Sequence, residues 1–159
     1  MSEVRVLFVC LGNICRSPTA HGVFQHTVKQ AGLAHVIQVD SAGTSNWHVG
    51  SPPDTRSAAE ARKRGYDLSP LRARQAIARD FNEFDYILAM DKYNLADLEH
   101  LRLADFTGHL GLFLEFSRQK HYREMPDPYH GGASGFTLVL DLVEDASAGL
   151  LEHIQRQHL

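Results

Sequence analysis

The two cysteines of this 159-residue chain lie in one short stretch, and an arginine follows directly after the second. Cys10 and Cys15 are separated by four residues, and Arg16 stands six positions after Cys10. A thiolate is a strong nucleophile, and the planar guanidinium of arginine matches two oxygens of a phosphate group. The pair Cys10 and Arg16 therefore predicts nucleophilic chemistry on an anion. The spacing alone also fits a simpler interpretation, a buried cysteine followed by a solvated arginine.

The residues around this pair are typical of a loop that binds an anion. Residues 6–9 are apolar and predict a buried strand that ends at Cys10, and Pro18 is tolerated in the first turn of a helix. Gly12 and Asn13 are residue types that accept positive φ, which a loop curling its N–H groups inward requires. We expect such a loop, opening onto a helix N-terminus, to bind a dianion and to stabilise a thiolate at Cys10.

The rest of the chain alternates between strand patterns and helix patterns. The apolar runs predict strands over residues 4–9, 36–40, 84–90 and 110–114. The apolar stripes predict helices over residues 18–31, 55–64 and 135–157, and a further helix that Asp91 caps. This alternation predicts one α/β domain, residues 1–159, with a four-stranded parallel sheet, helices on both faces and a phosphate-binding loop after the first strand. Ligands bind such sheets at the carboxyl ends of the strands, so we expect residues 10–17, 41–47, 91–94 and 127–129 to lie there.

Composition argues against several other classes of protein. The formal net charge of −3 disfavours a nucleic-acid partner, and no apolar stretch reaches the length of a membrane span, so no membrane insertion is expected. The ten histidines show no metal-binding spacing, which predicts no metal and no cofactor. Because both cysteines lie in one loop, they are typical of a reducing compartment, and we expect a cytoplasmic protein. Export by a non-classical route would leave no signal in the sequence.

The stretch of residues 9–18 resembles the phosphate-binding loop of the low-molecular-weight protein tyrosine phosphatases, and the chain resembles bacterial members most. The resemblance covers nearly the whole chain and includes residues 40–44, Trp47, Asp54, Arg56, 73–75, 90–91, Asn94 and 127–129. Another class of tyrosine phosphatase has a histidine before its cysteine. Val9 stands at that position here, which excludes that class.

The resemblance implies a two-step hydrolysis of phosphotyrosine and of small aryl phosphates. Cys10 would attack phosphorus and form a cysteinyl-phosphate, while Arg16 and the loop amides bind the equatorial oxygens. Asp127 would protonate the leaving phenolate and then act as base toward water. Without the resemblance, Asp127 before a proline would be interpreted as an ordinary turn residue.

The resemblance also assigns supporting roles around these three residues. The loop would be held in place by hydrogen bonds from Asn13, Ser17 and Ser41. The substrate would be bound by Leu11, Gly12, Ile14, Cys15, Trp47 and Tyr129. Taken singly, the aromatic residues would more often be packing residues. In this family a neighbouring cysteine can form a reversible disulfide with the nucleophile, which implies the pair Cys10 and Cys15 here. His130 replaces a tyrosine that many members carry, and its effect on the cleft rim stays open.

The implied partner is a tyrosine-phosphorylated protein, for which a tyrosine kinase is one candidate, and the chain would be a monomer or a weak homodimer. Two alternatives remain open from the residues. An arsenate reductase shares this fold and loop, but it relays a disulfide through further cysteines, and none follows Cys15. A phosphotyrosine-binding module without turnover would have lost the cysteine, arginine or aspartate, and all three are present here.

Overall fold

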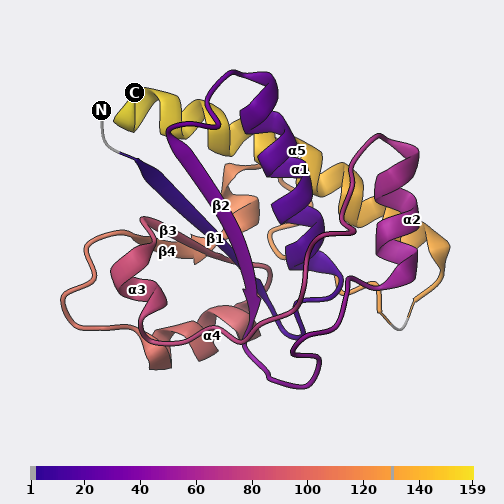
Figure 1. The fold of residues 1–159 in the computed structure, drawn as a ribbon, viewed down its shortest axis with the longest axis horizontal. Coiled ribbons are helices and arrows are strands. Elements are labelled where there is room, and N and C mark those ends of the chain that lie inside the picture. The colour runs from indigo at the N-terminus through magenta and orange to yellow at the C-terminus, as the bar shows by residue number, and fades with distance from the viewer. Residues whose placement is uncertain (1–2, 130) are drawn as a thin grey trace.

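Four parallel strands form the centre of the computed structural model, which describes residues 3–129 and 131–159. The strands are β1 (Val4–Cys10), β2 (Ile37–Gly43), β3 (Tyr86–Ala89) and β4 (His109–Leu112), and they lie in the order β2-β1-β3-β4. One face carries α1 (Arg16–Gln30), α2 (Thr55–Lys63), α5 (Ala133–His158) and the 3-10 turn η1 (Phe113–Phe116). The other face carries α3 (Asp80–Glu83) and α4 (Lys92–Leu101) (Figure 1). The predicted α/β class, parallel sheet and two covered faces are confirmed.

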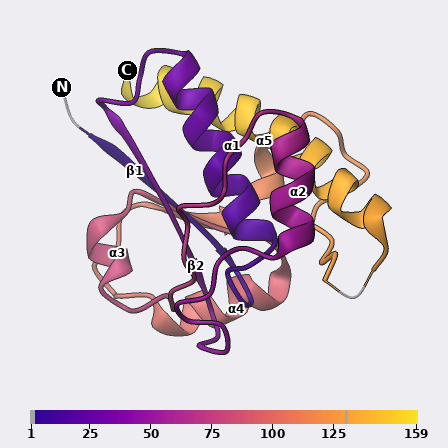
Figure 2. The same cartoon turned by 45° about the vertical axis from the view of Figure 1, so that its right-hand side comes forward.

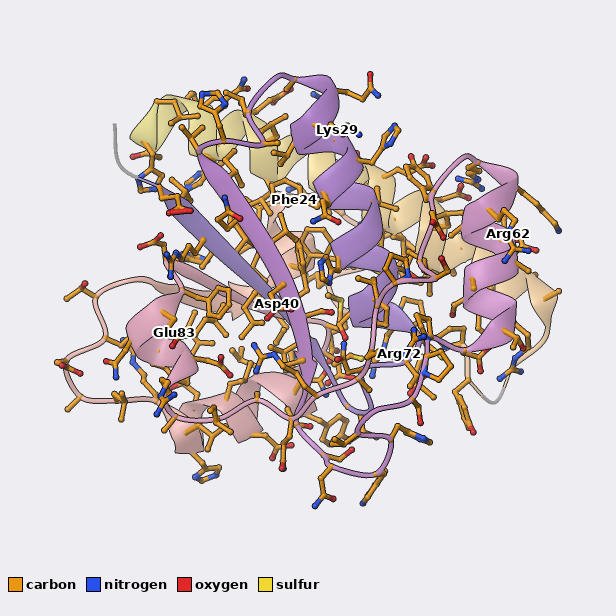
Figure 3. All side chains as sticks on the ribbon, in the orientation of Figure 1. Phe24, Lys29, Asp40, Arg62, Arg72 and Glu83 are labelled. Carbon is orange, nitrogen blue, oxygen red and sulfur yellow. The ribbon has the colours of Figure 1, made fainter. Side chains whose placement is uncertain are left out.

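The pleat of β1 divides its apolar side chains between two cores. Phe8 points toward α1 and α5, where its ring meets those of Phe24 and Phe113 at 5.7 and 4.8 Å. Leu7 and Val9 point the other way, toward α3 and α4. Figure 3 labels Phe24, a residue of α1 that is fully buried in the first of these cores. Burial on both faces explains why β1 is a continuous run of apolar residues. The same packing holds the end of the strand, at Cys10, in place.

The strands differ at their ends from the sequence prediction. β2 extends to Gly43, beyond the predicted end at residue 40, because residues 41–43 pair with residues 8–10 of β1. A Cβ on Gly43 would lie 2.7 Å from the carbonyl oxygen of Leu11, so glycine allows the loop after β1 to approach. β3 is shorter than residues 84–90 because Phe84 ends α3, and β4 stops at Leu112 because η1 follows.

α2 and α4 begin where their caps predict, whereas α5 begins at Ala133, two residues before the predicted start. Asp54 and Asp91 cap α2 and α4 by accepting hydrogen bonds from the backbone N–H groups of Arg56 and Asn94. α1 begins at Arg16, two residues before the predicted start, and Pro18 occupies its first turn. The short helix α3 was not predicted. Figures 1 and 2 show that the loops after β1 and β2 lie together at the end of the sheet where α1 and α4 begin.

Within the described residues, no helix is both long enough and apolar enough to cross a membrane.

Candidate active site

A small cavity opens at the carboxyl ends of the strands, above the loop that joins β1 to α1. Its volume is about 120 Å³, well below the roughly 300–1,000 Å³ of sites for drug-sized ligands. It is lined by Cys10, Leu11, Gly12, Ile14, Cys15, Arg16, Trp47, His48, Asp127 and Tyr129. The cavity therefore brings residues more than a hundred positions apart around a space suited to a small group.

The backbone of the loop turns its carbonyl groups away from this cavity. The carbonyl oxygens of Cys10, Leu11 and Ile14 accept hydrogen bonds from the backbone N–H groups of Thr44, Ser45 and Asp54, at 2.9, 3.0 and 2.7 Å. Among the described residues, the N–H groups of residues 11–15 find no acceptor. Consecutive N–H groups without an internal acceptor form a concave site for an anion, and the N-terminus of α1 adds its positive dipole.

Asn13 holds the bend of the loop. It has φ of 56°, which confirms that this position needs a residue tolerant of the left-handed region. Its Oδ1 accepts from the backbone N–H of Arg74 at 3.1 Å, and its Nδ2 donates to the Ser17 hydroxyl at 2.7 Å. The prediction of positive φ at Gly12 is wrong. A Cβ there would lie 2.9 Å from the ring of His48, so a larger residue would require His48 to shift.

The sulfur of Cys10 lies at the base of the cavity, 3.0 Å from the Ser17 hydroxyl oxygen. The same hydroxyl lies 3.3 Å from the carbonyl oxygen of Ala42 and accepts the bond from Asn13. A hydroxyl has one proton, so Ser17 donates either to Ala42 or to the sulfur. When Cys10 is a thiolate, the charge-assisted bond to sulfur is the stronger of the two. Ser17 is therefore placed to stabilise the thiolate.

Arg16 is almost fully buried, with its guanidinium surrounded by acceptors. Its Nη1 donates to Asp91 Oδ2 at 2.6 Å and to the carbonyl oxygen of Met125 at 3.0 Å, while Nη2 lies 3.6 Å from Asp127 Oδ2. Burial lowers the pKa of Arg16, but Cys10, Asp91 and Asp127 outweigh burial and raise that pKa above its ordinary value. The guanidinium is thus a fixed positive charge at the wall of the cavity.

Asp127 reaches the same cavity from a loop between η1 and α5. The backbone N–H of Met125 donates to the carbonyl oxygen of Met90 at 2.7 Å, which ties this loop to the end of β3. Asp127 Oδ1 accepts from the backbone N–H of Tyr129 at 3.0 Å, closing a tight turn. The side chain remains 42% exposed, so its carboxyl group can exchange a proton with solvent.

Flat and apolar side chains form the rim of the cavity. Trp47 is 71% exposed, Tyr129 is 38% exposed, and the rings of His48 and Tyr129 lie 6.4 Å apart. Leu11 and Ile14 complete the lining from the loop itself. Flat apolar walls of this kind can pack against an aromatic ring.

Cys15 is buried beside Cys10 but differs from it in its surroundings. Burial, together with the nearby charges of Asp54, Cys10 and Asp127, raises the pKa of Cys15 to about 12, against a hydrogen bond with Ser57 that lowers it. The Cys15 thiol is therefore neutral at physiological pH, and a neutral thiol is a poor nucleophile.

Comparison with known proteins places the chain in a family. Residues 5–159 match the sequence profile of the family described as low molecular weight phosphotyrosine protein phosphatase. The chain belongs to this family. Homologues from Bacillus subtilis and Schizosaccharomyces pombe, and a structural neighbour from Entamoeba histolytica, are named as tyrosine phosphatases, so the chain is an enzyme of the phosphoric monoester hydrolase class.

Individual relatives of this phosphatase extend over its whole length. A Synechocystis sp. protein that carries the family's name is 44% identical over 97% of this chain and 98% of its own. The low molecular weight protein-tyrosine-phosphatase YfkJ of Bacillus subtilis is 37% identical over 97% of each chain. The protein tyrosine phosphatase of Entamoeba histolytica, solved with Hepes in its active site, superposes with a TM-score of 0.94 at 36% identity and covers 99% of this chain and 100% of that chain.

The phosphatase places one predicted support residue outside the loop. The hydroxyl of Ser41, on β2, lies 2.9 Å from Nδ1 of His21 on α1. Burial lowers the pKa of His21, with a smaller opposing effect of Asp40 and a lowering effect of Arg74. Ser41 is connected to the loop through other residues: its backbone N–H donates to Asp40, the Arg74 side chain also bonds Asp40, and the Arg74 backbone N–H donates to Asn13. His130 lies outside the described residues.

Two groups at the site were not assigned from the sequence. Asp91 holds Arg16, and the carbonyl oxygen of Met125 accepts from the same guanidinium. Asp91 could have been identified as a site residue from its position directly after β3. The Met125 carbonyl has no signal in the sequence, because its position arises from loop packing.

Proposed function

We propose that this phosphatase hydrolyses phosphotyrosine, and small aryl phosphates, through a cysteinyl-phosphate intermediate. The observation that carries the proposal is the meeting of four groups in one cavity: the Cys10 sulfur, the unpaired loop amides, the buried Arg16 guanidinium and the Asp127 carboxyl. Each supplies something that phosphoryl transfer requires, namely a nucleophile, stabilisation of the equatorial oxygens, and a proton donor.

In the first step the Cys10 thiolate attacks phosphorus. The S–P bond forms while the bond between phosphorus and the phenolic oxygen breaks, and Asp127 gives its proton to that oxygen. The loop amides and Arg16 bind the three equatorial oxygens as charge develops on them. Ser17 stabilises the thiolate before attack, through the hydroxyl that lies 3.0 Å from the sulfur.

In the second step water replaces the thiolate. Asp127, now a carboxylate, takes a proton from water as the new P–O bond forms and the S–P bond breaks, which restores the thiolate and releases inorganic phosphate. Every group in this cycle belongs to the chain or to water. The same carboxyl group serves both steps because the phenol leaves from the position that water then takes.

The shape of the rim supports an aryl phosphate as substrate. Leu11, Ile14, Trp47 and Tyr129 form apolar walls around an opening that leads down to Cys10. A phenyl ring buries its faces against such walls, whereas the short side chains of phosphoserine and phosphothreonine would not reach them while their phosphorus lies at Cys10.

The partner that we propose is a tyrosine-phosphorylated protein, and a tyrosine kinase that carries phosphotyrosine is one such protein. The two free thiols in one loop support a reducing compartment such as the cytoplasm. We further propose that residues 1–159 act as one catalytic domain, as a monomer or a weak homodimer.

Trapping the intermediate tests this function directly. Acid quenching during turnover of p-nitrophenyl phosphate should leave one phosphate on Cys10, located by mass spectrometry. Cys10→Ser should abolish turnover but retain binding of a phosphotyrosine peptide, and Cys15→Ser is the matched control that keeps Cys10. An active Cys10→Ser variant would refute the mechanism. Binding without turnover by the wild-type chain would indicate a binding module, and arsenate reduction with a thiol would indicate the reductase.

A further inference from the structure

Arg56, at the second position of α2, reaches across to the segment that carries Asp127. Its Nη2 donates to the carbonyl oxygen of Tyr129 at 2.9 Å. The guanidinium also lies 5.5 Å from the centroid of the Tyr129 ring and 4.6 Å from that of Phe136, in the first turns of α5. One side chain therefore binds both the turn that follows Asp127 and the helix into which that turn leads.

The guanidinium of Arg56 is itself held in place by Asp54. Nε donates to Asp54 Oδ1 at 3.1 Å and Nη2 donates to Oδ2 at 3.0 Å, a two-point contact that fixes the plane of the guanidinium. Burial raises the pKa of Asp54, but the hydrogen bonds and charge of Arg56 outweigh burial and lower that pKa, so the partner remains a carboxylate. The backbone N–H of Asp54 donates to Ile14 in the nucleophile loop.

These contacts form a continuous connection between the two loops of the site. It runs from Ile14 in the nucleophile loop through Asp54 and Arg56 to Tyr129, whose backbone N–H donates to Asp127 Oδ1. Arg56 does not line the cavity.

Arg16 faces Asp127 directly, with its Nη2 3.6 Å from Asp127 Oδ2. In the proposed reaction Arg16 binds the oxygens of the phosphoryl group. Once substrate enters, Arg16 therefore interacts with these oxygens as well as with Asp127 and holds Asp127 less strongly. The hydrogen bond from Arg56 to the Tyr129 carbonyl lies outside the cavity and is unaffected by the substrate. Arg56 therefore holds the acid at a fixed distance from the sulfur during the steps in which Arg16 is engaged.

We propose that Arg56 is a positioning residue, which sets the place of Asp127 relative to Cys10 through the carbonyl group of Tyr129. This inference rests on the proposed function. It gives Arg56 a role in placing Asp127, which donates the proton to the leaving group, and no share in binding the phosphate.

The test compares leaving groups that need protonation to different degrees. In Arg56→Met we expect kcat for phenyl phosphate to fall about tenfold with KM within about twofold, because proton transfer is impaired and binding is not. For p-nitrophenyl phosphate, whose phenolate leaves readily, we expect kcat to fall by less than about threefold. Arg56→Lys keeps a donor for Tyr129 without the two-point fork and should restore part of the loss. Arg62→Met, in the last turn of the same helix, is the matched control (Figure 3).

A double mutant and a measurement without substrate complete the test. Adding Arg56→Met to Asp127→Asn should reduce kcat no further, since the acid is already absent. Hydrogen exchange at the Tyr129 amide should become faster in Arg56→Met than in Arg62→Met, whether or not the protein is active. Equal losses for both substrates, additivity with Asp127→Asn, or unchanged exchange would overturn the inference. Loss of the proposed function would instead show as an inactive wild-type chain.

Discussion

Asp91 connects the start of α4 to the arginine of the active site. Its Oδ1 accepts from the backbone N–H of Asn94, which caps the helix, and its Oδ2 accepts from Arg16 Nη1 at 2.6 Å. Asp91 follows β3 directly, so the strand, the helix cap and the guanidinium are fixed by one side chain. A change at Asp91 should therefore alter both stability and catalysis.

We expect Asp91→Asn to keep the cap and remove the charge. Asparagine caps helices as well as aspartate does, but Arg16 would keep its buried charge with a neutral partner. Loss of one partner of a buried pair costs roughly 3 kcal/mol, and a less well held Arg16 should lower kcat/KM about tenfold. Urea unfolding and assays with p-nitrophenyl phosphate measure the two effects. Asp97→Asn, exposed on the same helix, is the control, and equal behaviour of the two variants would contradict the prediction.

Ser17→Ala should slow both catalysis and alkylation of Cys10. The change removes the hydroxyl 3.0 Å from the sulfur and leaves Asn13 Nδ2 without its acceptor. Loss of one hydrogen-bond donor to a charged group, here the Cys10 thiolate, should lower kcat about tenfold or more. Iodoacetamide labelling at pH 6 reports thiolate reactivity independently of substrate. Ser147→Ala removes another buried hydroxyl, one for which the described residues offer no partner, and it should leave both rates unchanged.

Much of the fold follows from the sequence because its apolar runs are buried on both faces. β1 shows this most clearly, since all of residues 6–10 are buried and the run of apolar residues marks the strand. α3 escaped prediction because a single turn of four residues has no periodicity. The end of β4 was misplaced because Phe113 and Leu114 are apolar in a 3-10 turn as they would be in a strand.

The site residues that lie close together in the sequence can be predicted from it, whereas contacts that depend on tertiary packing cannot. Cys10, Asn13 and Arg16 lie within seven residues, so strand, loop and helix signals combine there. Asp127 was placed only through the family resemblance, because an aspartate before proline has the same local pattern in any turn. The bond between Arg16 and Asp91 joins residues 75 positions apart, and no local pattern indicates such a contact.

Cys15 should make the protein less stable at alkaline pH. Its pKa is raised to about 12 in the folded state from an ordinary value of 9.0, so the folded chain holds this proton more tightly than the unfolded chain does. The resulting stability is fully present below pH 9 and is lost as pH rises from 9 toward 12. Urea unfolding of the wild-type chain and of Cys15→Ala at pH 7 and pH 10 measures it. A difference between the two proteins that does not shrink at pH 10 would contradict the assignment.

The neutral thiol of Cys15 also defines how a disulfide with Cys10 would form. Hydrogen peroxide would oxidise the Cys10 thiolate to a sulfenic acid, and the Cys15 thiol would then condense with it, releasing water and forming the S–S bond. We expect dithiothreitol to restore activity after brief peroxide treatment of the wild-type chain. Cys15→Ala should lose activity irreversibly, because Cys10 then oxidises further. Irreversible loss in the wild-type chain as well would argue against this disulfide.

The far end of the sheet, away from the active site, should respond to acid. His153 packs its ring 5.7 Å from that of Tyr86 and 5.1 Å from that of Phe116. Burial, together with the charges of His109, Arg156 and His158, lowers the pKa of His153 below 6.5, against a smaller effect of Glu115. The folded chain therefore binds this proton less readily than the unfolded chain, and stability falls as pH drops below about 6.5 toward the lowered pKa.

His153→Gln tests this response because glutamine stays neutral and retains most of the volume. Between pH 7.5 and pH 5.5 the free energy of unfolding should fall less in this variant than in the wild-type chain. His100→Gln, on the exposed side of α4, controls for the loss of a histidine in general and should follow the wild-type curve. Urea titrations across the pH range supply the measurement. If His153→Gln loses as much stability on acidification as the wild-type chain, the acid response arises elsewhere, and the packing of His153 against Tyr86 carries no titrating charge.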